Sequence, residues 1–218
     1  MTALERVEAA ASSLKLFPLP SAVLLPHSVM TLHIFEPRYR ALVRDALASD
    51  KVMGLAQLQP GWEPTYAGRP PMKPLACAGL IIFHEELAEG RYNILLQGVC
   101  RVRILEELAP AQPYRQARVQ ALPDPDHRGT EEDRLVQAVF ELSSHLPSEV
   151  ADSLLPAMAR ANGGALADLV AAAIVEDPER RQALLAELNV PRRLTSVLDD
   201  VGEMLARRQP VTPSGPLN

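Results

Sequence analysis

The spacing of apolar residues divides the chain into two parts near residue 122. In the first part, short apolar runs rich in β-branched residues are separated by prolines and glycines, which is typical of strands. In the second part, alanine- and leucine-rich segments repeat their apolar positions at helical spacing. The pattern therefore predicts an α+β protein, with strands first and a helical bundle after them.

The first part is predicted to hold consecutive strands and one early helix. The helix begins at Pro37, because a proline is tolerated in the first turn and apolar residues follow at helical spacing. The predicted strands are Leu14–Phe17, Val23–Leu25, Val29–Ile34, Val52–Leu58, Ala76–Leu87, Tyr92–Leu108 and Pro113–Leu122. Such an order favours a small, closed or nearly closed β-barrel, because closure removes unpaired edges.

A long hairpin is the main feature of these strands. Ala76–Leu87 and Tyr92–Leu108 would pair around a turn at Glu89 and Gly90. Gly98 lies inside the second arm and predicts a bulge or sharp bend.

Helices are predicted from Thr130 onward, after a linker with two prolines. Thr130 and Asp133 resemble a capping box. Further helices are expected to begin near Pro147, Ala165, Pro178 and Pro191. The predicted organisation is a flexible amino terminus (1–13), a barrel domain (14–122), a helical-bundle domain (130–208) and a disordered tail (209–218).

Composition narrows the possible functions. The formal net charge of −5 argues against a general nucleic-acid binder, which needs a basic surface. The aromatic fraction of 4% leaves few rings to stack on bases. No apolar run approaches the ~20 residues that span a bilayer, and the first residues lack the apolar core of a secretory signal. We therefore expect a cytoplasmic protein without membrane contact.

The two cysteines are expected to be free thiols. Cys77 and Cys100 lie on the two arms of the predicted hairpin. With a two-residue turn, Cys77 would face Val102, and Cys100 would be a diagonal neighbour about 7–8 Å away. This is too far for an unstrained disulfide, although a bulge at Gly98 would shift the register.

Three blocks of sequence resemble one known family. The first combines Phe17–Pro26 with LHIFEPRY at Leu32–Tyr39, the second is GRYNILLQGVCRVRI at Gly90–Ile104, and the third is Leu166–Leu205. In this order they resemble the amino-terminal, substrate-binding domain of the Lon ATP-dependent protease. The resemblance implies a PUA-like β-barrel followed by a helical bundle, and a role in recognising unfolded or tagged protein segments. It also implies similarity to bacterial proteins that consist of this domain alone.

The chemistry of a full Lon protease is not expected here. A Walker A loop needs a lysine directly after a glycine, and none of Lys15, Lys51 and Lys73, the only lysines, follows one. A Ser–Lys dyad needs a lysine desolvated beside a serine, whereas these three border turns. No His or Cys pair has zinc-ligand spacing. We therefore expect no catalytic residue, no cofactor and no metal.

One candidate binding surface is the turn-rich loop Gln59–Pro74. Trp62, Tyr66 and Met72 could act as exposed anchors for weak binding of many protein partners. The alternative is that Trp62 folds back on the core. The loop residues alone do not decide between these two interpretations.

The cluster Phe35, Glu36, Arg38 and Tyr39 is interpreted as a structural motif. Glu36 is placed to cap the helix, and Tyr39 belongs to the helix's apolar face. An arginine at this point can tie the preceding strand to the helix through an ion pair.

The main hypothesis is a non-catalytic module that binds protein or peptide segments. The alternatives are an RNA-binding PUA-like protein, or a small-ligand or hydrolytic enzyme that uses the mouth of the barrel. Neither a membrane nor nucleic acid is an expected partner, and a homo-oligomer stays open.

Overall fold

Six strands form one mixed sheet in the computed structural model, which describes residues 1–66 and 68–208. The strands are β1 (Leu14–Leu19), β2 (Val29–Ile34), β3 (Val52–Gln57), β4 (Leu75–Leu87), β5 (Arg91–Glu107) and β6 (Arg115–Leu122). Their order is β2-β5-β4-β3-β1-β6, and β6 also pairs with β5. The pairings of β5, β4, β3, β1 and β6 therefore return to their starting strand, and we call these five strands the ring. The β1–β3 pairing is parallel and the others are antiparallel.

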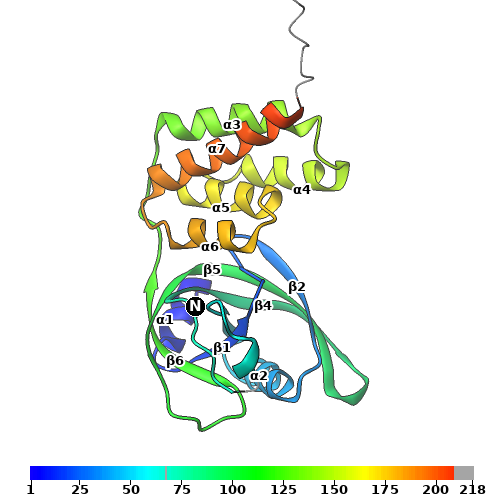
Figure 1. The fold of residues 1–218 in the computed structure, drawn as a ribbon, viewed down its shortest axis with the longest axis vertical. Helices are drawn as coiled ribbons and strands as arrows, with labels where there is room; N and C mark the ends of the chain where they lie inside the picture. Colours follow the sequence, from blue (N-terminus) through cyan, green and yellow to red (C-terminus); the bar gives the residue numbers. More distant parts are fainter. Residues whose placement is uncertain (67, 209–218) are drawn as a thin grey trace, which may run out of the picture.

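The hairpin of β4 and β5 extends beyond the ring. The first half of β5 pairs with β2 on one side and with the second half of β4 on the other. We call this three-stranded region, residues 29–34, 81–87 and 91–97, the arm. Figure 1 shows the tip of the hairpin projecting at the lower right, away from the helices of residues 130–208.

The turn of this hairpin differs from the prediction. It contains the three residues Ala88–Gly90 (η2), because Glu89 and Gly90 both adopt positive φ values of 64° and 68°. The predicted register is therefore wrong, and Cys77 lies opposite Arg101 instead of Val102.

The bulge predicted at Gly98 is confirmed. The register shifts between the pair Gly79–Gly98 and the pair Ala78–Cys100. A side chain at position 98 would collide with the carbonyl oxygen of Leu25, so the close approach of these two backbones requires glycine.

Both cysteines are free and buried, as predicted. Cys77 belongs to the hydrophobic cluster that reaches the helices, and Cys100 belongs to the second cluster, inside the ring. Burial raises the pKa of both thiols, that of Cys100 to about 11. Their side chains leave opposite faces of the sheet, which explains why no disulfide joins them.

The amino terminus contains a helix where a flexible segment was expected. Helix α1 (Ala3–Ala10) begins with a capping box. The Thr2 side chain accepts a hydrogen bond from the backbone N–H of Glu5 at 3.2 Å, and the Glu5 carboxylate accepts one from the Thr2 N–H at 2.7 Å. Val7 of this helix is fully buried, so α1 closes one end of the second cluster.

The remaining helices agree in number and order with the predicted ones. They are α2 (Pro37–Leu47), α3 (Thr130–Ser143), α4 (Ser148–Met158), α5 (Gly163–Ile174), α6 (Pro178–Ala186) and α7 (Val190–Arg208), with a short 3-10 turn η1 (Glu63–Thr65). The predicted capping box at Thr130 is wrong, because Gly129 is the N-cap residue and no side chain caps α3. Among the described residues, no helix is long and apolar enough to cross a membrane.

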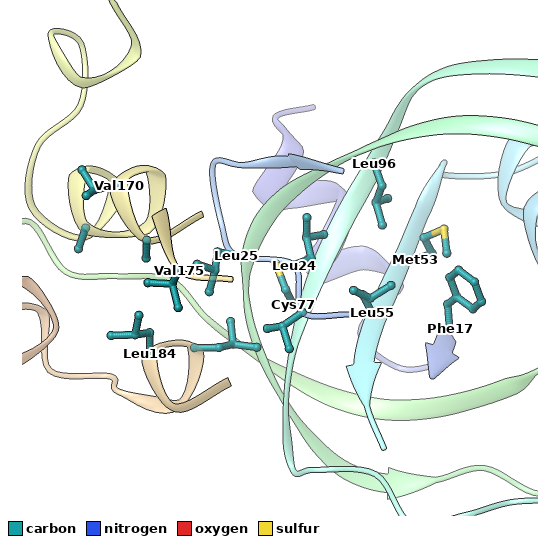
Figure 2. Packing of buried hydrophobic residues seen from close by; sticks show 14 of the residues in the cluster. Phe17, Leu24, Leu25, Met53, Leu55, Cys77, Leu96, Val170, Val175 and Leu184 are labelled. Atoms are coloured by element: carbon teal, nitrogen blue, oxygen red, sulfur yellow. The ribbon is translucent and has the colours of Figure 1, made fainter. Parts of the chain in front are cut away.

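The largest hydrophobic cluster joins the strands to the helices. The predicted strand Val23–Leu25 is wrong. This segment is irregular, and its side chains are buried in this cluster. Figure 2 shows Leu25 between Val175, on the helical side, and Cys77, on the sheet. Whether the two parts form separate domains stays a prediction, and the predicted tail, 209–218, lies outside the described residues.

Candidate functional site

Hydrogen bonds across the arm define its outer face. His33 Nδ1 lies 2.8 Å from Asn93 Oδ1, and Asn93 Nδ2 donates to Glu85 Oε2 at 3.1 Å. The three residues come from β2, β5 and β4, so their side chains share one face of the arm.

Exposed apolar side chains gather on this same face. Next to the row of His33, Asn93 and Glu85, and two positions further along each strand, Thr31 lies opposite Leu95, and Leu95 lies opposite Phe83. Phe83 is 55% exposed, Val29 is 53% exposed, and Ile82, the extra residue at a register shift, is 48% exposed. We call Val29, Ile82, Phe83 and Leu95 the outer apolar face. Because apolar side chains gather there, we treat this face as the candidate interaction surface.

Phe35 extends this surface at the end of β2. It is 61% exposed, and its ring is stacked on the ring of His33 with a centroid distance of 6.1 Å. Phe35 was interpreted as part of a structural motif, but its side chain lies beside the outer apolar face.

The other three motif residues connect α2 to its neighbours. Tyr39 is buried, and its hydroxyl donates to the Pro18 carbonyl oxygen at 3.3 Å. Glu36 is the N-cap residue of α2, but its side chain makes no capping hydrogen bond, so the predicted cap is wrong. Its carboxylate instead accepts from Arg38 Nε at 3.0 Å and from the Tyr66 hydroxyl at 2.8 Å. The ion pair therefore lies within the start of α2, and the hydrogen bonds of Glu36 and Arg38 to Tyr66 tie the helix to the loop, and not to the preceding strand.

The loop places only two of its three predicted anchors together. Trp62 and Tyr66 meet edge to face with a centroid distance of 5.3 Å, whereas Met72 pairs with Leu58 and packs against the second cluster. All three are half-buried. Their role in protein binding stays a prediction.

A buried ion cluster lies where the strands meet the helices. Arg101 of β5 makes two hydrogen bonds of 2.7 Å to the Asp168 carboxylate of α5, and both side chains are fully buried. Arg193 of α7 is also fully buried, with its Nε 3.4 Å from Asp168 Oδ1 and its Nη2 bonded to Asp124. Burial lowers the pKa of the Arg101 guanidinium, but the hydrogen bonds and charge of Asp168 outweigh it and leave this pKa raised. The cluster therefore joins β5 to α5 and α7 through buried ion pairs.

A cavity of about 430 Å³ lies next to this cluster. Its lining includes Thr2, His27, Gly98, Arg101 and Asp124. Thr2 is engaged in the cap of α1, and Asp124 is bonded to Arg193. Burial lowers the pKa of His27. Within residues 1–66 and 68–208, no three His, Cys, Asp or Glu side chains gather closely enough to hold a metal ion.

Glu107 at the end of β5 gives a testable pH effect. It accepts from Arg115 Nε at 2.6 Å and from Arg69 Nε at 2.9 Å. Burial alone would raise the pKa of this carboxyl, but the hydrogen bonds from the two arginines outweigh it and lower the pKa. A lowered pKa in the folded state stabilises the fold above the unfolded value of about 4.3, and this stabilisation is lost as the pH falls further.

We therefore expect Glu107→Gln to lower the free energy of unfolding at pH 7, and by less as the pH falls below about 4. Urea unfolding of both proteins across this range measures the difference. Glu106→Gln is the matched control, because Glu106 pairs with Arg118 on the exposed surface, and it should change little at any pH. A pH-independent loss in Glu107→Gln would contradict the assignment.

Comparison with known proteins identifies the family. The family model for the substrate-binding domain of ATP-dependent protease La (LON) matches residues 13–201. The chain belongs to this family. The resemblance found in the sequence is therefore confirmed, over nearly the same span.

Curated relatives of this Lon substrate-binding domain are much longer. Lon protease 2 of Myxococcus xanthus is 29% identical over 206 residues, which cover 91% of this chain and 24% of the relative. Lon protease of Roseiflexus castenholzii is 33% identical over 195 residues, covering 85% of this chain and 23% of the relative. The chain thus spans about a quarter of the length of these relatives.

Solved structures share the fold. The N-terminal domain of Mycobacterium avium complex Lon protease has a TM-score of 0.67 at 18% identity, covering 88% of this chain and 99% of that chain. A Lon N-terminal domain protein from Xanthomonas campestris has a TM-score of 0.63 at 23% identity, covering 91% and 99%. The α+β fold of the Lon domain is therefore shared.

The sequence reasoning missed the outer apolar face, although a signal was present. Ile81, Ile82 and Phe83 are consecutive apolar residues in a strand. Because successive side chains of a strand point to opposite faces, they cannot all enter the core.

Proposed function

We propose that this Lon-family chain is a non-catalytic module that binds unfolded protein segments through its outer apolar face. Phe83 carries the proposal, because it is a large apolar side chain held 55% exposed on β4, where Phe83 pairs with Leu95 of β5. Family membership supports a protein partner, and the formal net charge of −5 favours proteins over nucleic acids.

We also propose a finer description of the fold and of its surroundings. The ring, with α2 beside it, is proposed to be a barrel of the PUA-like kind. The reducing cytoplasm is the proposed location, because Cys77 and Cys100 are free thiols. Parts 14–122 and 130–208 are proposed as the barrel and bundle domains.

A titration with one polypeptide in two states tests the function. A fluorescently labelled disulfide-containing protein is used either native or reduced and alkylated, so that its composition is constant and only its fold differs. We expect a saturable rise in fluorescence polarisation with the unfolded form alone. Equal binding of both forms, or binding of neither, would overturn the proposal.

Trp62, Tyr66 and Met72 are proposed as a secondary contact for the same clients. Since Trp62 already packs against Tyr66, it has less apolar surface to offer than Phe83. We expect Trp62→Ala to weaken binding of the unfolded polypeptide by less than about tenfold, with Trp62→Phe as the control that keeps an aromatic ring. A larger loss than that caused by Phe83→Ser would move the primary site to this loop.

A further inference from the structure

Strand β2 leaves one of its edges without a partner. Gly98 N donates to Ser28 O at 2.9 Å, so these residues form a hydrogen-bonded pair of the β2–β5 ladder. Hydrogen-bonded and non-bonded pairs alternate in antiparallel strands. The backbone N–H and C=O groups of Val29, Thr31 and His33 therefore point away from β5.

These outward groups have no partner within the described part of the chain. β2 is the first strand of the sheet order and pairs with β5 alone. No loop in residues 1–66 and 68–208 makes a hydrogen bond to the backbone of Val29, Thr31 or His33. Unpaired backbone groups are rarely buried, which indicates that this edge is open to solvent.

β2 also lacks the features that usually protect an edge strand. Natural edges carry lysines, prolines, inward charges or bulges. The sequence of β2, VMTLHI, contains none of these residues, and its pairing with β5 is regular from Val29 to Ile34. The free edge of β4 beyond Ile81 is different, because Glu85 and Glu86 place charges there.

We propose that an extended segment of an unfolded protein adds to β2 as a further strand of the arm. This inference rests on the proposed function and names its binding mode. The outward donors and acceptors recur at every second residue, or about 6.8 Å, a spacing that an extended polypeptide matches. The added strand would lie ~4.8 Å from β2, and its side chains would extend the row formed by Thr31, Leu95 and Phe83.

Charge favours an apolar segment with a basic end over a second copy of this chain. The hairpin tip carries three carboxylates, those of Glu85, Glu86 and Glu89, against the guanidinium groups of Arg40 and Arg91. A lysine or arginine beyond the Ile34 end of β2 would meet this excess of negative charge. A second copy brings its own formal net charge of −5 and is repelled.

Thr31→Pro tests the proposal on the protein. Proline removes the outward N–H and fills the edge, but the ladder to β5 does not use this N–H, so the fold should tolerate it. We expect binding of the unfolded polypeptide to weaken by about tenfold or more, since two or more hydrogen bonds are lost. Thr31→Val keeps the N–H and should bind as wild type, and circular dichroism of both variants checks the fold.

N-methylated peptides test it without changing the protein. The probe is an eight-residue peptide of alternating valine and threonine with one terminal lysine. Methyl groups on every second backbone nitrogen should abolish binding when they lie on the edge that faces β2, and should leave it unchanged when they lie on the other edge. Two peptides that differ only in the parity of methylation therefore give opposite results.

The outcomes separate this inference from the proposed function. If Thr31→Pro and both methylated peptides bind normally while Phe83→Ser does not, strand addition is overturned and the apolar site stands. If Phe83→Ser also binds normally, the proposed site is overturned as well. Light scattering tests whether a second copy occupies the edge. If the wild type forms a dimer, Thr31→Pro abolishes this dimer and the peptide fails to dissociate it, a second copy occupies the edge and the inference is overturned.

Discussion

Replacing Asp168 by alanine should lower the free energy of unfolding by about 3–5 kcal/mol. The fully buried carboxylate accepts two hydrogen bonds of 2.7 Å from Arg101 and lies 3.4 Å from Arg193 Nε. Without it, the one carboxylate in residues 1–66 and 68–208 that still pairs with the two buried guanidinium groups is that of Asp124. Because a domain is stable by only about 5–15 kcal/mol, such a loss is a large share of the total. Urea unfolding followed by circular dichroism measures it.

Asp200→Ala is the matched control for this prediction. Asp200 of α7 also pairs with an arginine, Arg180, at 3.0 Å, but near the surface. The same change there should cost about 0–1 kcal/mol. An equally small loss in Asp168→Ala would contradict the account of the junction, because the cluster would then not hold the helices on the sheet.

Substituting the outer apolar face should weaken client binding without weakening the fold. We expect the double variant Val29→Ser and Phe83→Ser to reduce the affinity for the unfolded polypeptide roughly 10- to 100-fold. Each half-exposed side chain offers about 1 kcal/mol of apolar contact to a client, and ~1.4 kcal/mol is tenfold in affinity. The free energy of unfolding should stay within about 0.5 kcal/mol of wild type, because these side chains lie outside the core.

Phe140 supplies the control for that experiment. It lies on α3 and is 58% exposed, nearly the same as Phe83, but it is not part of the arm. Phe140→Ser should therefore leave the affinity unchanged. If both variants lose affinity equally, binding would be general hydrophobic adhesion and not recognition by the arm.

The sequence predicted the regular elements because local patterns determine them. Val29–Ile34 alternates partly buried and exposed residues, and Pro37–Leu47 combines a first-turn proline with helical spacing. Helix α1 was missed although Thr2 and Glu5 form a readable capping box. Val23–Leu25 was assigned as a strand, because a short buried loop has the same apolar composition as a short strand.

Other features depend on tertiary structure and could not be predicted. The hairpin register changed because Glu89 takes a left-handed conformation that its sequence context does not require. Arg101 and Asp168 are charged residues within apolar runs, which is a visible anomaly, but they lie 67 positions apart. Only the tertiary packing of the helices against the strands brings them together.

Amide hydrogen exchange, with and without a saturating unfolded polypeptide, tests the central claim most directly. The account predicts that the client slows exchange in the arm, at residues 29–34 and 81–87, and above all at the outward amides of Val29, Thr31 and His33. Exchange in α3 to α7 should not change. Protection confined to Gln59–Pro74 or to the helices, with the arm unaffected, would contradict the claim that the arm is where this Lon-family chain holds its clients.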